Sequence, residues 1–178
     1  MPTTKSQLLN NLNTNFGRLK PVGIREFDYK ASAIPGIIKL TLGEPDFNVP
    51  EVMKKAAIDS IENNDSHYAP GSGSIQLLKA IAKFMADRYG LTYDPTNEIA
   101  VTVGATEGIY ASLSALVNPG DEVLITTPTF PLYMAVTTIL GGKPVEINTS
   151  NDQFVLTPER LRQVIAEHPN AKAIILNY

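Results

Sequence analysis

The sequence contains no cysteine and only two histidines, His67 and His168. Without cysteine the chain can form no disulfide framework, no thiolate metal site and no cysteine nucleophile. Two imidazoles alone are a poor basis for a zinc centre, which usually needs three or four protein ligands. These absences argue against disulfide-stapled proteins, thiol enzymes and zinc enzymes.

An excess of basic charge is also absent. The 15 lysine and arginine residues are balanced by 18 aspartate and glutamate residues, which leaves a net charge of −3. Such a chain has no positive field to attract a nucleic-acid backbone or an anionic lipid surface. We therefore expect neither nucleic acid nor membrane among its partners.

Long apolar runs are missing as well. No stretch reaches the ~20 apolar residues that a membrane-spanning helix needs, and the polar residues 1–15 lack the apolar core of a signal peptide. The composition, 43% hydrophobic and 19% charged, is typical of a globular protein with a buried core. We expect a cytoplasmic protein.

The pattern of the chain changes near Gly43. Before it, the apolar spacing in residues 21–34 predicts a short helix that Pro35 and Gly36 end, and residues 37–42 predict a short strand. After Asn48, which we expect to cap the next helix, helices and strands alternate. The predicted helices cover residues 50–61, 75–89, 106–117, 131–140 and 158–167, and the predicted strands cover residues 99–103, 122–126, 144–147 and 173–177.

This alternation predicts an α/β fold with three layers, in which helices cover both faces of a mostly parallel sheet. The apolar runs at residues 100–103, 123–125 and 173–176 suit strands that are buried on both faces. The last predicted strand ends at Tyr178 with no helix after it. We expect the sequence to be a fragment that stops within a domain.

The junction between residues 103 and 108 is the first candidate for a site. Its small residues allow a close approach to the backbone, Thr106 offers a hydroxyl, and the start of a helix presents unpaired N–H groups. A phosphate suits such a place, although an ordinary tight turn explains the same residues. The P-loop pattern GxxxxGK[ST] and the pattern GxGxxG are both absent.

Two aromatic residues are the next candidates. Phe130 follows a predicted strand and could stack on a planar ligand, or it could simply pack helix against sheet. Tyr68 lies in a loop rich in glycine and serine, where functional groups often occur, but it could equally be an ordinary surface tyrosine. No GxSxG motif supports a hydrolase.

Five motifs taken in order resemble the N-terminal part of a class I/II, fold type I, pyridoxal-phosphate-dependent aminotransferase. They are LTLGEPDF at residues 40–47, HYAPGSG at 67–73, VTVGATE at 101–107, NPGDEV at 118–123 and TPTFPLY at 127–133. Two further segments, IREF at 24–27 and AIILNY at 173–178, look most like the bacterial aromatic amino acid aminotransferases. That branch passes the amino group to 2-oxoglutarate.

The resemblance implies a role for each site residue. The backbone amides of Ala105 and Thr106 would hold the phosphate of pyridoxal 5'-phosphate, and Phe130 would stack on its ring. The N–H of Gly43 would meet the substrate carboxylate, and Tyr68 would reach a cofactor phosphate in the partner subunit of a homodimer with shared active sites. Residues 1–44 would belong to the small domain, and residues 45–178 would form the first part of the large cofactor-binding domain.

The resemblance also shows what this sequence lacks. The family's cofactor-contacting asparagine, its aspartate for the pyridine nitrogen, its Schiff-base lysine and its carboxylate-binding arginine would all follow Tyr178. Asn177 precedes the asparagine motif, so it receives no cofactor role. We expect no catalytic residue in this chain and no transaminase activity from the 178 residues alone. A fold type I lyase or synthase, or a non-catalytic cofactor-binding or regulatory module, remains an alternative.

Overall fold

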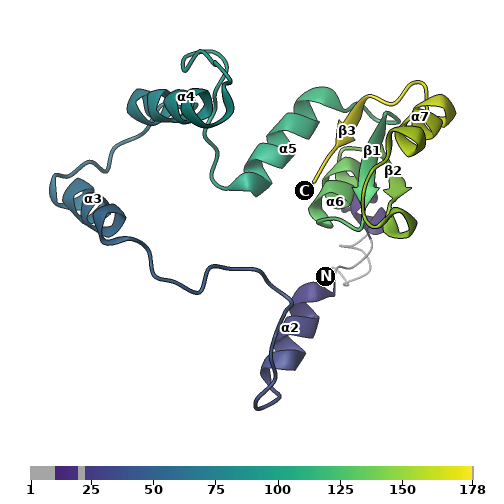
Figure 1. Ribbon diagram of the computed structural model, residues 1–178, viewed down its shortest axis with the longest axis horizontal. Coiled ribbons are helices and arrows are strands. Elements are labelled where there is room, and N and C mark those ends of the chain that lie inside the picture. The colour runs from purple at the N-terminus through teal and green to yellow at the C-terminus, as the bar shows by residue number, and fades with distance from the viewer. Residues whose placement is uncertain (1–10, 20–22, 178) are drawn as a thin grey trace, which may run out of the picture. The chain divides into compact units, whose positions relative to one another are not determined.

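The computed structural model describes residues 11–19 and 23–177, which form two compact units. We call Gly23–Thr102 the helical unit, and we call the described residues of Met1–Val22 and Val103–Tyr178 the sheet unit. Figure 1 labels their elements. Pro21 and Val22, which begin the first predicted helix, and Tyr178 lie outside the described residues.

The helical unit contains three α-helices: α2 (Ile24–Ser32), α3 (Glu51–Glu62) and α4 (Ile75–Tyr89). Helix α4 has the predicted bounds because both of its ends are fixed locally. At its start the Ser74 hydroxyl accepts a hydrogen bond from the Leu77 amide at 3.4 Å, and at its end Gly90 adopts a left-handed conformation with φ 68°. Long connections without helix or strand join these helices (Figure 1).

Three predictions for residues 37–103 are wrong. Residues 37–42 and 99–103 form no strand. In the first segment the side chains of Ile38 and Leu40 are 86% and 92% exposed, and in the second the Val101 amide bonds only a loop carbonyl, that of Ser72. Asn48 does not cap α3, because the helix begins after Pro50 and has no side-chain cap.

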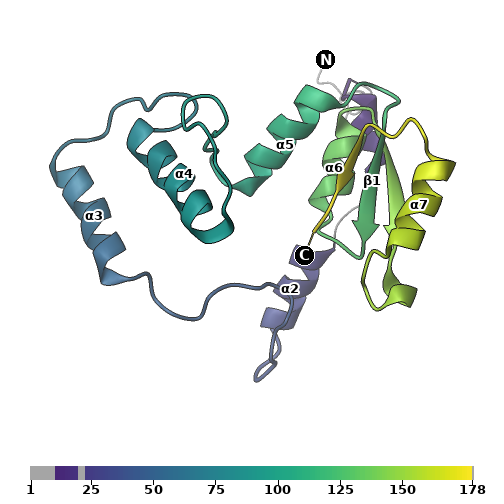
Figure 2. The ribbon, with the colours of Figure 1, turned by 45° about the horizontal axis from the view of Figure 1, so that its top comes forward.

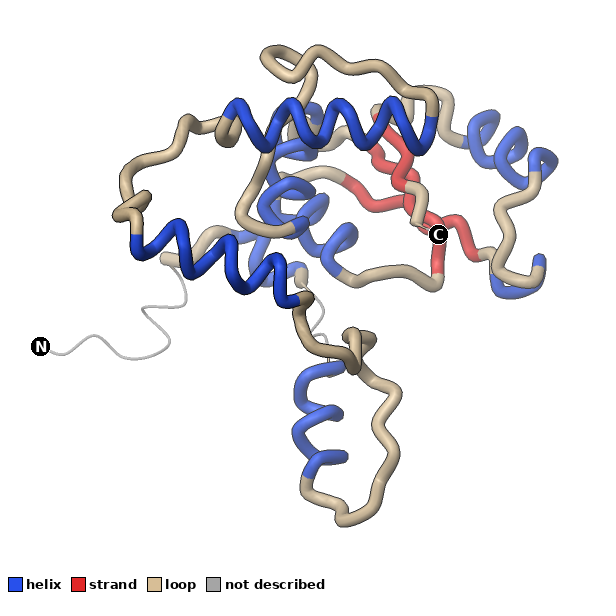
Figure 3. The backbone as a smooth tube through the Cα atoms, turned by 60° about the vertical axis from the view of Figure 1, so that its left-hand side comes forward, coloured by secondary structure: helices blue, strands red, loops and turns tan. Residues whose placement is uncertain are grey.

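The sheet unit is built on three parallel strands in the order β2-β1-β3. The strands are β1 (Glu122–Thr127), β2 (Lys143–Asn148) and β3 (Ala173–Ile175). Figure 3 shows them side by side in red. Val123 of the central strand pairs with Pro144 on one side and with Ala173 on the other, so all three strands end at the same edge, which we call the carboxyl edge.

Helices cover both faces of this sheet. Helices α5 (Ala105–Leu116) and α6 (Leu132–Ile139) lie on one face, and α7 (Pro158–Glu167) lies on the other, as Figure 2 shows. Two short 3₁₀ helices, η1 (Thr14–Arg18) and η2 (Ser150–Asp152), complete the unit. The predicted three-layer α/β fold with a parallel sheet is therefore confirmed.

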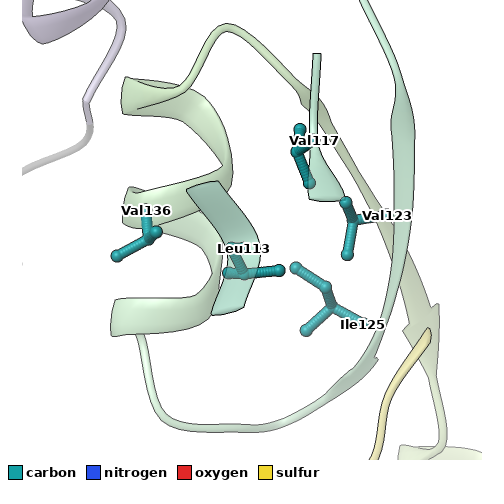
Figure 4. Packing of buried hydrophobic residues seen from close by; sticks show 5 residues of the cluster. All are labelled: Leu113, Val117, Val123, Ile125 and Val136. Carbon is teal, nitrogen blue, oxygen red and sulfur yellow. The ribbon is translucent and has the colours of Figure 1, made fainter. Parts of the chain in front are cut away.

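The side chains of β1 alternate between the two helical layers. Val123 and Ile125 pack with three side chains of the α5 and α6 layer, namely Leu113, Val117 and Val136 (Figure 4). Leu124 points the other way and packs with Ile147 and with Val164 of α7. Burying an aliphatic side chain of this size stabilises the fold by about 1.5–3 kcal/mol. The side chains of β1 therefore hold both helical layers against the sheet. No described helix is both long and apolar enough to cross a membrane.

Candidate functional site

Helix α5 begins at an unusual backbone position. Its N-cap residue is Gly104, with φ 81° and ψ 163°, a region that is essentially restricted to glycine. No side chain caps the helix, whereas Ser74 and Thr157 cap α4 and α7. Because α5 runs back along the sheet against the direction of β1, its first turn lies toward the carboxyl edge (Figure 2).

The first two amides of α5 are those of Ala105 and Thr106, and both residues are exposed. Amides at the first positions of a helix have no acceptor within it, and no hydrogen bond joins these two to another described residue. The Glu107 carboxylate instead accepts a hydrogen bond from the Val103 amide. The helix start therefore presents two N–H groups and the positive end of its dipole to solvent.

Phe130 lies in the junction between β1 and α6, also at the carboxyl edge. Its side chain is 51% exposed, so it is not the core residue that one interpretation of the sequence predicted. The ring of Tyr133 lies against it in a T-shaped contact with a centroid distance of 5.9 Å. Much of the ring surface therefore remains available to a planar ligand.

The same junction contains a buried polar atom without a partner. The hydroxyl oxygen of Thr129 is inaccessible to solvent and forms no hydrogen bond within the part of the chain that the structure describes. A buried hydroxyl in this state is uncommon in proteins. Its position next to Phe130 adds a polar group to an edge that already carries an exposed aromatic ring.

Charged side chains gather at the opposite, amino edge of the sheet. There the Lys172 ammonium lies 4.0 Å from the Asp121 carboxylate, and His168 Nδ1 lies 3.0 Å from Glu122 Oε2. Hydrogen bonds from the Asn118 amide and side chain lower the pKa of Asp121. No group of three or more His, Cys, Asp or Glu among the described residues could hold a metal ion, at either edge or in the helical unit.

Ala105, Thr106 and Phe130 belong to the sheet unit, and Gly43 and Tyr68 belong to the helical unit. Gly43 follows a segment that Asp28 of α2 holds by hydrogen bonds from Thr41 and Lys39. The bond from Thr41 is the main cause that lowers the pKa of Asp28. Tyr68 lies in a loop and its side chain is fully exposed.

One contact at the carboxyl edge was not predicted from the sequence. The Tyr133 hydroxyl donates a hydrogen bond to Asn177 Oδ1 at 3.0 Å, and so joins the start of α6 to the end of β3. The two residues are 44 positions apart, and no local pattern connects them. The sequence signal for this contact is weak: Tyr133 lies three residues after the candidate residue Phe130.

Comparison with known proteins identifies the family. The family model for class I and II aminotransferases matches residues 35–178. The chain belongs to this family. Its members use pyridoxal phosphate and act on amino acids and 2-oxo acids, typically as dimers.

Individual aminotransferases agree with this assignment. The chain is 34% identical to aromatic-amino-acid aminotransferase 2 of Thermococcus litoralis, over 93% of this chain and 42% of that protein. It is 36% identical to aspartate aminotransferase of Pyrococcus abyssi, over 89% of this chain and 41% of that protein. The chain thus spans about two fifths of the length of the curated relatives that it matches.

Solved aminotransferase structures share the fold. Aspartate aminotransferase from Thermus thermophilus with maleate superimposes with a TM-score of 0.84 at 32% sequence identity. The match covers 94% of this chain and 44% of that one. The resemblance to fold type I aminotransferases is therefore confirmed in both sequence and structure.

The carboxyl edge is compatible with pyridoxal phosphate. Two exposed amides without described partners suit its phosphate, and the half-exposed ring of Phe130 suits its ring. The assignment of Ala105, Thr106, Phe130, Gly43 and Tyr68 to individual roles stays a prediction.

Proposed function

We propose that this chain forms the first part of a pyridoxal-phosphate-dependent aminotransferase that moves an amino group from an aromatic amino acid to a 2-oxo acid such as 2-oxoglutarate. The observation that carries the proposal is the uncapped start of α5, which shares the carboxyl edge with the exposed ring of Phe130. Ligands of open parallel sheets bind at this edge.

In this proposal the amides of Ala105 and Thr106 hold the cofactor phosphate, where the helix dipole favours negative charge by about 0.3–1 kcal/mol. Phe130 stacks on the cofactor ring and excludes water from one of its faces. When bound, pyridoxal phosphate supplies the electron-withdrawing ring that transamination requires. Contacts to the phosphate and to the ring would together orient pyridoxal phosphate on the sheet unit.

Gly43 and Tyr68 would complete the site. The Gly43 amide would bind the substrate carboxylate, the role that the resemblance to aminotransferases implies. Tyr68 would reach a cofactor phosphate in the partner subunit of a homodimer, and its full exposure suits a residue whose contacts lie outside its own chain. Residues 1–44 would form the small-domain segment and residues 45–178 the start of the large domain of a cytoplasmic enzyme.

The proposal gives these 178 residues no catalytic base. The lysines among the described residues of the sheet unit are Lys143 and Lys172, and each lies at the amino end of a strand. A base must come within about 2.6–3.2 Å of the proton that it moves. As the resemblance to aminotransferases implies, the catalytic lysine would come from a longer polypeptide that contains this chain.

The amino donor needs a test of its own, because the relatives include both aromatic and aspartate aminotransferases. Steady-state assays of the whole protein with tyrosine, phenylalanine or aspartate as donor and 2-oxoglutarate as acceptor would separate them. We expect the higher kcat/KM for the aromatic donors. A preference for aspartate would contradict the proposed donor, and release of ammonia without glutamate would favour a lyase.

Cofactor binding tests the site itself. We expect Phe130→Ala to weaken the affinity of the chain for pyridoxal phosphate by about 2- to 12-fold, which corresponds to the 0.5–1.5 kcal/mol of an aromatic contact. Affinity for inorganic phosphate should not change. Phe16→Ala is the matched control, because Phe16 lies in the same unit and is 52% exposed, against 51% for Phe130. Equal losses in the two variants would contradict the role of Phe130.

A further inference from the structure

Three side chains at the carboxyl edge of the sheet unit lie in contact as a series. Asn177 Oδ1 accepts the hydrogen bond from the Tyr133 hydroxyl at 3.0 Å. The Tyr133 ring in turn meets the Phe130 ring at a centroid distance of 5.9 Å and an interplanar angle of 88°. The series thus runs from the end of β3, through the first turn of α6, to the junction that follows β1.

The members of this series differ in how firmly they are held. Phe130 is about half exposed and precedes α6, so little packing fixes its ring. Tyr133 packs against the core cluster of Leu113, Val117, Val123, Ile125 and Val136. Asn177 follows β3, two residues after its last residue Ile175, which pairs with Ile125 of the central strand. The sheet therefore anchors one end of the series, and the exposed ring forms the other.

The geometry points to Asn177 as a positioning residue for the cofactor ring. Asn177 orients Tyr133, and Tyr133 orients the Phe130 ring that would stack on the cofactor. An edge-to-face contact depends on the orientation of both rings. The hydroxyl bond to Asn177 limits the rotation of the Tyr133 ring, and the near-perpendicular contact with that ring sets the plane of the Phe130 ring. This inference rests on the proposed function only where it assigns Phe130 to a cofactor.

The variants follow from the donor and the acceptor of the hydrogen bond. Asn177→Leu removes the acceptor, Tyr133→Phe removes the donor and keeps the ring, and Asn177→Asp keeps an acceptor oxygen. Asn148→Leu is the matched control, because Asn148 ends the neighbouring strand β2 and its side chain bonds only the Ser150 amide among the described residues.

The first arm needs no cofactor. In the NMR spectrum of the free 178-residue chain, we expect an NOE cross-peak between the Phe130 and Tyr133 rings. We expect Asn177→Leu and Tyr133→Phe to weaken this peak and to shift the Phe130 ring resonances. In Asn177→Asp we expect the peak and the resonances to match those of the parent chain. Unchanged Phe130 resonances in Asn177→Leu would overturn the inference, because a bond that only strengthens the fold would leave the ring pair intact.

The second arm measures the dissociation constant of pyridoxal phosphate. We expect Asn177→Leu to raise it by about 2- to 12-fold, the range expected from one net hydrogen bond. The double variant with Tyr133→Phe should show no further loss, and the effect should vanish in the Phe130→Ala background. Additive losses would overturn the inference. A parent chain that binds no pyridoxal phosphate would contradict the proposed function instead, and the first arm would still decide the coupling.

Discussion

The substitution Gly104→Ala tests the backbone geometry at the start of α5. Gly104 has φ 81° and ψ 163°, and a Cβ built on it meets no heavy atom within 4 Å. The cost of the new methyl group is therefore conformational and not a clash with a neighbour. A non-glycine residue in such a region costs about 1–3 kcal/mol, so we expect the free energy of unfolding to fall by that amount.

The same change should disturb anion binding. If the substituted residue relieves its strain by turning to negative φ, the amides of Ala105 and Thr106 no longer point in the same direction. We expect the affinity for inorganic phosphate to fall by about two- to fivefold, which corresponds to the 0.3–1 kcal/mol that a helix N-terminus contributes. Urea denaturation followed by circular dichroism measures the stability, and amide NMR shifts during a phosphate titration measure the affinity.

Gly17→Ala is the control for this experiment. Gly17 lies in the same unit, has no neighbour within 4 Å of a built Cβ and is not among the glycines with positive φ. We expect its substitution to change stability by no more than about 0.5 kcal/mol in the unfavourable direction. If Gly104→Ala behaved like this control in both assays, the positive φ of Gly104 would matter neither for stability nor for phosphate binding.

Three further results are expected. Gly142→Ala should destabilise the chain by about 1–3 kcal/mol in urea unfolding, because the new Cβ would lie 2.7 Å from Val117 Cγ1 and 3.1 Å from Thr137; an unchanged midpoint would refute this packing. The lowered pKa of Asp121 contributes stability above the unfolded-state pKa that is lost as pH falls below about 4, so Asp121→Asn should flatten the acid limb of a stability profile; an unchanged limb would contradict it. The 178-residue chain with pyridoxal phosphate, tyrosine and 2-oxoglutarate should form glutamate no faster than free cofactor does, and saturable turnover abolished by one Lys→Ala change would refute this.

The sequence predicts the helices well where local side chains fix their ends. Helices α4 and α7 have the predicted bounds, because Ser74 and Thr157 cap their starts and Gly90 ends α4. The strands β1, β2 and β3 were predicted to within two residues for a related reason. Each is an apolar run between turn residues, and in the structure each finds a parallel neighbour.

Residues 37–42 and 99–103 were predicted as strands and form none, because a sequence pattern does not identify a partner strand. A strand forms only when another strand completes its hydrogen-bond ladder, and a sequence pattern does not specify that partner. Apolar content alone could not decide the matter, since Leu40 and Val103 are both 92% exposed. Helices need no such partner, which is why the helix predictions held better than the strand predictions.

The candidate site divides in the same way. Local features predicted the start of α5 and selected Phe130 as a candidate, because small residues before a helix and an aromatic after a strand are neighbours in sequence. They left open whether Phe130 is exposed or packs helix against sheet. The bond between Tyr133 and Asn177 joins residues from two different βα junctions. Such a contact follows from the order of the strands in the sheet, which the sequence pattern left open.

The most direct test of the proposed cofactor site is an NMR titration of the ¹⁵N-labelled chain with inorganic phosphate and then with pyridoxal phosphate. The uncapped start of α5 can be compared in one spectrum with the starts of α4 and α7, whose first turns Ser74 and Thr157 already cap. We predict that the largest amide shifts for both ligands occur at Ala105 and Thr106, and that only pyridoxal phosphate also shifts the Phe130 ring. Equal shifts at all three helix starts, or the largest shifts elsewhere, would contradict a cofactor site at the carboxyl edge.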